Sequence, residues 1–114
     1  VESGFLGTVS TKKGQPWITQ VRLNNTTLLF KIDTGADVTV IPEKDLRKIG
    51  EQKLSKSDRK LYRPGNSELK VLGKFACELE SNNAFSVQDI FVVKGLNQAL
   101  LGRPAIQALK IIEQ

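Results

Sequence analysis

The sequence predicts a small all-β domain, a closed barrel or a sandwich, with one or two helical turns. Short runs of alternating or β-branched apolar residues recur along the chain, and turn-forming residues separate them about every 8 to 15 positions. With 39% hydrophobic and 25% charged residues spread over its length, the chain of 114 residues suits a single domain over residues 1–114.

Each predicted element depends on local pattern. Strands are expected where side chains alternate or are β-branched, at residues 16–23, 28–32, 38–41, 61–63, 68–72, 75–80, 85–94 and 111–112. Asparagine, proline and glycine predict hairpin turns at 24–25, 64–66 and 81–83. Gly73 predicts a bulge or bend. Helical turns are expected at 43–49, ending at Gly50, and from Pro104 to about Leu109.

The composition excludes several kinds of catalytic site. The chain has no histidine, which excludes a serine–histidine hydrolase site. With no histidine and a single cysteine, Cys77, it also lacks the ligands of the usual zinc sites, and it cannot form an internal disulfide. Without a neighbouring base Cys77 is expected in the core or an interface. Carboxylates must therefore carry any chemistry, and neither metal nor cofactor is expected.

The net charge of +5 raises the question of a nucleic-acid partner. Residues 44–63 hold eight of the 17 basic residues, but acids are interspersed and Tyr62 is the only aromatic there. This pattern favours a solvated face, so nucleic acid is not expected as a direct ligand. No apolar run is long enough for a membrane span, and the single cysteine favours an intracellular setting.

The segment Asp33-Thr34-Gly35-Ala36 follows an apolar strand, so a rigid sheet would present the acid on a loop. Gly35 leaves room for a substrate backbone, Thr34 can hydrogen-bond to a neighbouring loop, and Ala36 adds no bulk. Taken alone, such a triplet also occurs in ordinary turns.

Three motifs in order resemble the retropepsins, the aspartic proteases of retroviruses and LTR retrotransposons. They are the active-site loop within residues 28–42, the flap position at Pro64-Gly65-Asn66, and Ala99-Leu100-Leu101-Gly102-Arg103 before a short helix. The resemblance covers residues 14–112 and is closest to gypsy-like retrotransposon proteases. It implies a small closed β-barrel of the retropepsin type with a flap hairpin and one short C-terminal helix.

The resemblance also implies roles for individual residues. Asp33 would be the catalytic acid, with Thr34, Gly35 and Ala36 supporting its loop. Gly35, Asp37 and the flap residues Pro64, Gly65 and Asn66 would contact substrate, and Asp37 would pair with Arg103.

The chain contains a single Asp-Thr-Gly, so one copy lacks half of a carboxyl dyad. A homodimer would place two copies of Asp33 on a two-fold axis. By resemblance, Thr34 would interlock the two loops, and terminal strands from residues 4–10 and 110–113 would hold the dimer together. Like charges so close raise one of the two pKa values, so that the pair shares a proton.

The expected function is therefore an aspartic endopeptidase that processes a retroviral or retrotransposon-type polyprotein, in the cytoplasm or an assembling virus-like particle. An inactive or domesticated dimerisation or peptide-binding module is an alternative, as is the protease domain of a cellular ubiquitin-linked protein. A small RNA-binding β-barrel is a third reading, and it predicts salt-sensitive RNA affinity.

Overall fold

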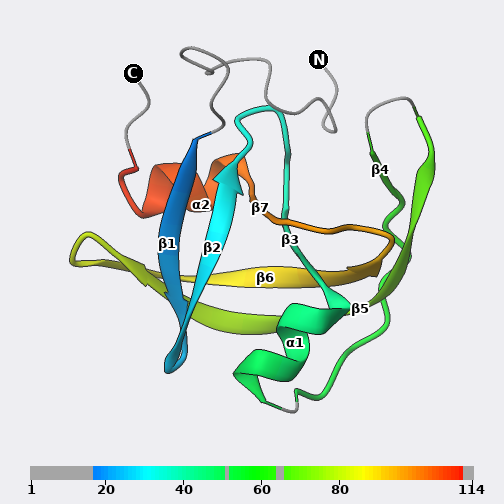
Figure 1. Ribbon diagram of the computed structural model, residues 1–114, viewed down its shortest axis with the longest axis horizontal. Helices are drawn as coiled ribbons and strands as arrows, with labels where there is room; N and C mark the ends of the chain where they lie inside the picture. The colour runs from blue at the N-terminus through cyan, green and yellow to red at the C-terminus, as the bar shows by residue number, and fades with distance from the viewer. Residues whose placement is uncertain (1–16, 51, 64–65, 112–114) are drawn as a thin grey trace.

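The computed structural model describes residues 17–50, 52–63 and 66–111. Strands dominate this part of the chain, and two short helices interrupt them (Figure 1). In chain order the elements are β1 (Ile18–Leu23), β2 (Thr26–Ile32), β3 (Thr39–Pro42), α1 (Glu43–Ile49), β4 (Leu61–Tyr62), β5 (Glu68–Ser81), β6 (Ala84–Lys94), β7 (Ala99–Leu101) and α2 (Arg103–Ala108). The predicted all-β class is confirmed.

Six of the strands close into a barrel. Their order around the sheet is β1, β2, β7, β3, β6 and β5, and β5 returns to β1 through the pairs Arg22–Glu80 and Leu23–Leu79. Closure leaves no free edge among these six strands. β4 lies outside the ring and pairs only with β5, which makes a hairpin that projects from the barrel (Figure 1).

The tight turns lie where asparagine was expected to make them. Asn24 connects β1 and β2 with φ +55°, and Asn82 and Asn83 connect β5 and β6 with φ +53° and +66°. Asparagine adopts this left-handed conformation more readily than most residues, and two such residues in succession suit a two-residue hairpin.

Gly73 is the predicted irregularity, but it does not end a strand. The register between β5 and β6 shifts between Val71 and Gly73, and β5 then continues to Ser81 as one long strand. A Cβ atom on Gly73 would lie 2.8 Å from Leu54 Cβ and 2.9 Å from Ser55 O. The bulge therefore admits the segment before β4, whose Ser55 exchanges backbone hydrogen bonds with Lys74.

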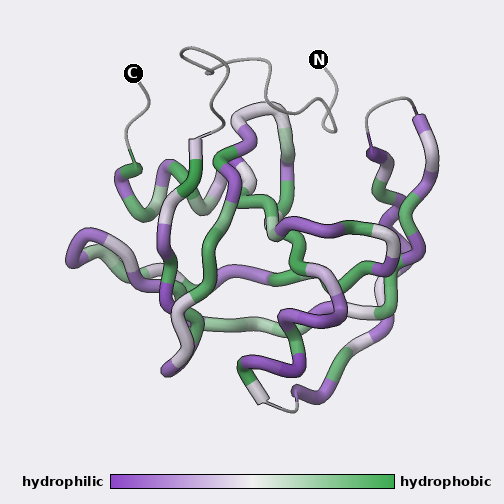
Figure 2. Tube along the Cα trace, viewed as in Figure 1, coloured by the Kyte–Doolittle hydropathy of each residue, from purple (hydrophilic) through white to green (hydrophobic). Residues whose placement is uncertain are grey.

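The core is built from buried apolar residues of all six barrel strands and of α2. Figure 2 shows hydrophobic positions recurring along these elements. The largest fully buried members of the core are Phe30, Leu23, Ile41, Leu79, Ile90, Leu101 and Leu109. Cys77 is 4% exposed and belongs to this core, as expected. A second, smaller apolar cluster is separate from it and consists of Val40, Leu69, Phe91, Val93 and Leu100. Some of its members line the candidate active site.

The helices are short and lie against the barrel. α1 covers the expected residues, with acids in its first turn and bases in its last, which suits the helix dipole. α2 begins at Arg103, one residue before the expected start, and ends at Ala108. Lys110, at φ +57°, ends the helix: its N–H donates to Gln107 O at 3.2 Å, and Ile111 N–H donates to Ile106 O at 3.0 Å. Ile111 therefore lies in no strand, and Ile112 is outside the described residues. None of the helices in the described ranges is long and apolar enough to cross a membrane.

Candidate active site

The loop that carries Asp33 is held by backbone hydrogen bonds on both sides. β2 runs parallel to β7, so that Ile32 is level with Leu101, and the next N–H, that of Asp33, donates to Leu101 O at 3.0 Å. Ala36 N–H donates back to Asp33 O at 3.1 Å and closes the turn. The carboxyl is thereby placed at the end of a strand whose position the barrel determines.

Asp33 is buried and has an incomplete set of hydrogen bonds. Its side chain is 2% exposed, and Oδ1 accepts the N–H of Gly35 at 3.1 Å. Oδ2 has no hydrogen-bond partner among the described residues. Burial raises the pKa of Asp33 from 3.8 to about 6, against the smaller opposing effects of the Gly35 N–H and the Lys31 charge. A buried, unpartnered carboxyl oxygen is a candidate functional group.

The second motif packs directly against this loop. Gly102 N–H donates to Thr39 Oγ1 at 3.0 Å, and Arg103 N–H donates to Ala36 O at 2.8 Å. A Cβ atom on Gly102 would lie 2.3 Å from Val38 O, so only glycine allows the two segments to approach this closely.

Arg103 contacts the loop through its side chain as well. Its Nη1 donates to Thr34 O at 3.0 Å and its Nη2 to Asp37 Oδ1 at 2.9 Å. The structure thus brings together Asp37 and Arg103, the two side chains that the resemblance to the retropepsins predicts to form an ion pair. Asp37 Oδ2 lies 3.7 Å from Arg59 Nη2, so one exposed carboxylate faces two guanidinium groups.

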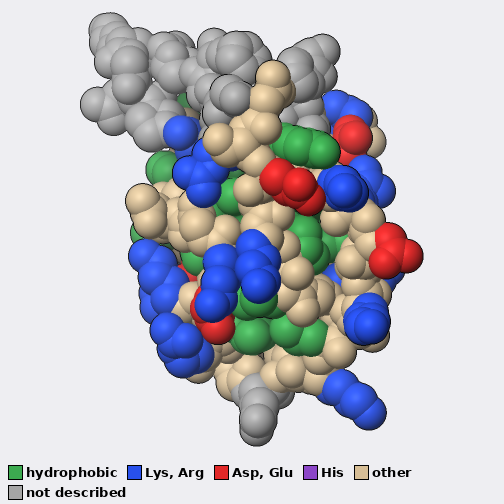
Figure 3. Space-filling view, turned by 90° about the vertical axis from the view of Figure 1, so that its right-hand side faces the viewer, with side chains coloured by type: hydrophobic (Ala, Val, Ile, Leu, Met, Phe, Trp, Pro, Cys, Tyr) green, Lys and Arg blue, Asp and Glu red, His purple; other side chains and the backbone are tan. Residues whose placement is uncertain are grey.

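A pocket of about 150 Å³ opens beside Asp33. Its floor comes largely from the second apolar cluster, including Val40, Leu69 and Leu100, and the β4 hairpin forms one wall. Figure 3 shows the side of the molecule that carries β4, where Lys and Arg side chains surround patches of apolar atoms.

The hairpin of β4 and β5 stands at the expected position of the flap. Arg63 N–H donates to Ser67 O at 2.9 Å, and Asn66, with φ +70°, donates to Arg63 O at 3.0 Å. The predicted flap residues Pro64 and Gly65 lie outside the described residues, and Asn66 does not line the pocket. Arg63, which lines the pocket, donates through Nη2 to Gly95 O on the loop after β6.

A family model described as aspartyl protease matches residues 19–105, most of the chain. The chain belongs to the aspartyl protease family.

Solved structures place this aspartyl protease in the retropepsin fold. EIAV protease, solved with the inhibitor HBY-793, superposes with a TM-score of 0.77 at 18% identity, over 93% of this chain and 99% of the viral chain. A retropepsin-like aspartic protease from Rickettsia conorii superposes with a TM-score of 0.66 at 20% identity, over 85% and 73% of the two chains. The search of curated protein sequences found no match.

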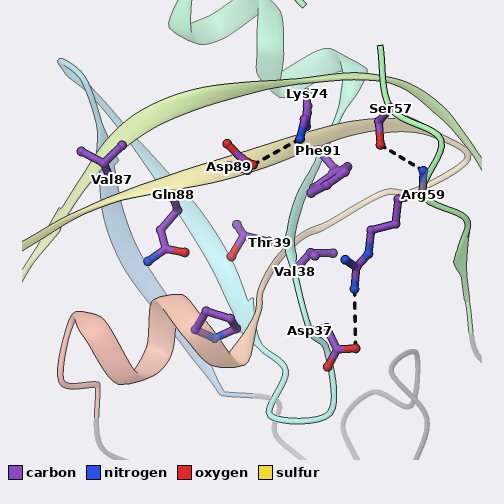
Figure 4. A pocket seen from close by; sticks show the side chains of 11 residues that line it. Asp37, Val38, Thr39, Ser57, Arg59, Lys74, Val87, Gln88, Asp89 and Phe91 are labelled. Carbon is purple, nitrogen blue, oxygen red and sulfur yellow. Dashed lines mark hydrogen bonds and ion pairs between the residues drawn. The ribbon is translucent and has the colours of Figure 1, made fainter. Parts of the chain in front are cut away.

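A second, wider hollow of about 540 Å³ adjoins the pocket of this aspartyl protease and shares Asp37, Val38 and Arg59 with it (Figure 4). Lys74 and Asp89 form an ion pair of 3.4 Å along its rim. Arg59 belongs to residues 44–63, which were expected to form a solvated face, and it was not predicted at the site. No local pattern could have indicated it, because its partner Asp37 is distant in sequence and is brought near only by the fold.

Proposed function

We propose that this aspartyl protease is an endopeptidase that works as a homodimer, with one Asp33 from each subunit. The observation that carries the proposal is the environment of Asp33, a buried carboxyl with one oxygen unpartnered among the described residues. The element opposite it in the same chain, Leu100-Leu101-Gly102, supplies no acid. A second copy related by a two-fold axis would supply the missing carboxyl.

The chemistry of such a pair is general acid and base catalysis. One carboxylate takes a proton from a water molecule, which then attacks the peptide carbonyl, while the other carboxyl, protonated, assists the departure of the amine. The burial that already raises the pKa of Asp33 in one subunit favours a shared proton. A second carboxyl nearby adds to this effect, and the pair titrates as a unit.

Substrate would bind as an extended segment between the loop of Asp33 and the flap. Gly35 and Asp37 would contact its backbone, and the flap residues Pro64, Gly65 and Asn66 would close over it and exclude water. Arg103 would hold Asp37 in place through the 2.9 Å contact. Thr34, half-buried in the single chain, would meet its counterpart in the partner subunit.

The proposed substrate is a polyprotein of the retroviral or retrotransposon type, and the proposed domain spans residues 1–114. Similarity to EIAV protease over nearly the whole of both chains supports this choice. The motif resemblance to gypsy-like retrotransposon proteases supports it independently.

The test is cleavage of an unstructured apolar reporter peptide over a range of enzyme concentrations. We expect specific activity to rise with concentration, pepstatin to block it, and Asp33→Asn to abolish it. Full activity in Asp33→Asn would refute the proposal. A folded dimer that cleaves nothing at any pH would instead support a domesticated binding module.

A further inference from the structure

One wall of the pocket beside Asp33 is strongly cationic. Arg59, Lys60 and Arg63 all line it, and all three come from the segment that leads into and through β4. Among the described residues of the lining, the acids are Asp33 and Asp37. Figure 3 shows more Lys and Arg than Asp and Glu side chains on the side of the molecule that carries β4.

The carboxylates of the described residues neutralise this wall only in part. Asp37 is already engaged by Arg103 at 2.9 Å, and its contact with Arg59 is longer, at 3.7 Å. The Arg63 guanidinium donates to the Gly95 carbonyl, a neutral acceptor. Lys60 makes no ion pair within the described ranges.

Nearby acids belong to a different hollow. Asp58 and Glu68 line a shallow depression that also touches Arg59 and Lys60, and neither acid lines the pocket of Asp33. The positive potential at the pocket mouth is therefore available to a ligand.

The floor of the pocket is apolar, and this combination selects a particular side chain. Val40, Leu69 and Leu100 are each at most 8% exposed and lie beneath the cationic wall. A glutamate would lay its two methylene groups on this floor and extend its carboxylate to the rim.

We propose that this pocket selects a glutamate of the substrate at one position flanking the scissile bond. The inference rests on the proposed protease function and adds a substrate class to it. It distinguishes glutamate from glutamine, which has the same shape without the charge, and from lysine, which the wall would repel.

The experiment measures kcat/KM for a set of peptides built on one cleavable apolar parent. Glutamate, glutamine or lysine replaces one residue at a time at the three positions on each side of the cleaved bond, at pH 6, where glutamate is ionised. At one position we expect glutamate to exceed glutamine about fivefold and lysine by more, with the preference declining at high salt.

Charge reversal in the wall provides the decisive comparison. Lys60→Glu and Arg63→Glu should each reduce the preference for glutamate over lysine at that position and, combined, reverse it. Lys44→Glu is the matched control, because it makes the same charge change on the exposed face of α1, away from the pocket. We expect it to leave the preference unchanged.

The outcomes separate the two proposals. Failure to cleave the parent peptide would refute the protease function. Cleavage of the parent with equal rates for glutamate, glutamine and lysine at every position would refute the glutamate preference alone. A preference that Lys44→Glu alters as much as Lys60→Glu would show that net charge is responsible and would also overturn the inference.

Discussion

At the scale of single residues, the acidity of Asp33 reflects competition between burial and local polar groups. Removal from water disfavours the charged carboxylate, whereas the Gly35 N–H and the charge of Lys31 favour it. Burial prevails, so the pKa rises to about 6. The group is then poised to exchange protons near neutral pH, as a general acid or base requires.

Asp33→Asn should abolish activity and stabilise the fold in a pH-dependent manner. Because the pKa of Asp33 rises from 3.8 to about 6 on folding, the folded state keeps its proton to higher pH, and wild type loses stability as pH rises through that interval. Asparagine avoids this loss. We expect the variant to exceed wild type by roughly 2 to 3 kcal/mol at pH 7.5 and by little at pH 3.5.

The measurement is urea unfolding of both proteins at the two pH values and one protein concentration. Activity should fall at least about 100-fold, since the variant cannot accept a proton. An equal stability difference at both pH values would contradict the assigned burial effect.

At the scale of elements, the site is a junction of β2, β3 and β7. The loop after β2 donates and accepts backbone hydrogen bonds with residues at the end of β7, and the side chain of Arg103 adds two more contacts. The position of Asp33 therefore depends on the close approach of Gly102 to Val38 and on the geometry of a single guanidinium group.

Gly102→Ala should destabilise the protein by about 3 kcal/mol, because the new methyl group would meet backbone atoms of Val38 that have no room to move. Gly50→Ala is the control. It has a φ of +94° but no atom within 4 Å of the added Cβ, so only backbone strain, about 1 kcal/mol, is expected. Thermal unfolding compares the two, and a smaller effect at Gly102 would show that β3 and β7 can separate.

Arg103→Lys should lower activity about tenfold while the barrel stays folded. A lysine cannot hydrogen-bond Thr34 O and Asp37 Oδ1 together, as the planar guanidinium does at 3.0 Å and 2.9 Å. Arg22→Lys is the matched control, since Arg22 pairs with Glu80 at 3.1 Å on the β1–β5 side of the barrel. Peptide cleavage and circular dichroism should show a loss of activity in the first variant alone; equal activities would assign Arg103 no positioning role.

At the scale of the whole molecule, the barrel is complete but the proposed dyad is not. Six strands of the described residues pair with one another around a closed ring. The single Asp-Thr-Gly makes the chain half of an enzyme under the proposed mechanism. Association would then regulate activity, because a single chain lacks the second acid.

Inactive Asp33→Asn subunits should therefore inhibit wild type when the two are mixed. If subunits pair at random, an equal amount of the variant should reduce activity per wild-type chain to about half, and a tenfold excess to roughly a tenth. An equal mass of an unrelated inert protein provides the control. Undiminished activity after subunit exchange would show that one Asp33 is sufficient.

Much of the fold could be predicted because its signals are local. Alternating side chains mark β1, Asn82 and Asn83 mark a turn, and the helix from Glu43 to Ile49 has its charges arranged along the dipole. The order of three short motifs was sufficient to indicate the family. The bulge expected at Gly73 is confirmed, and β5 continues through it from Glu68 to Ser81.

By itself, the sequence determined the class of fold and the candidate acid, since these depend on spacing and residue type. The pairing of Asp37 with Arg103 was expected only from the resemblance to the retropepsins. Only the tertiary structure decided which side chains share the pocket with Asp33. Barrel closure brings Arg59 to Asp37 and Arg63 to Gly95 across long stretches of chain. Burial, which shifts the pKa of Asp33, is likewise a property of the packed molecule.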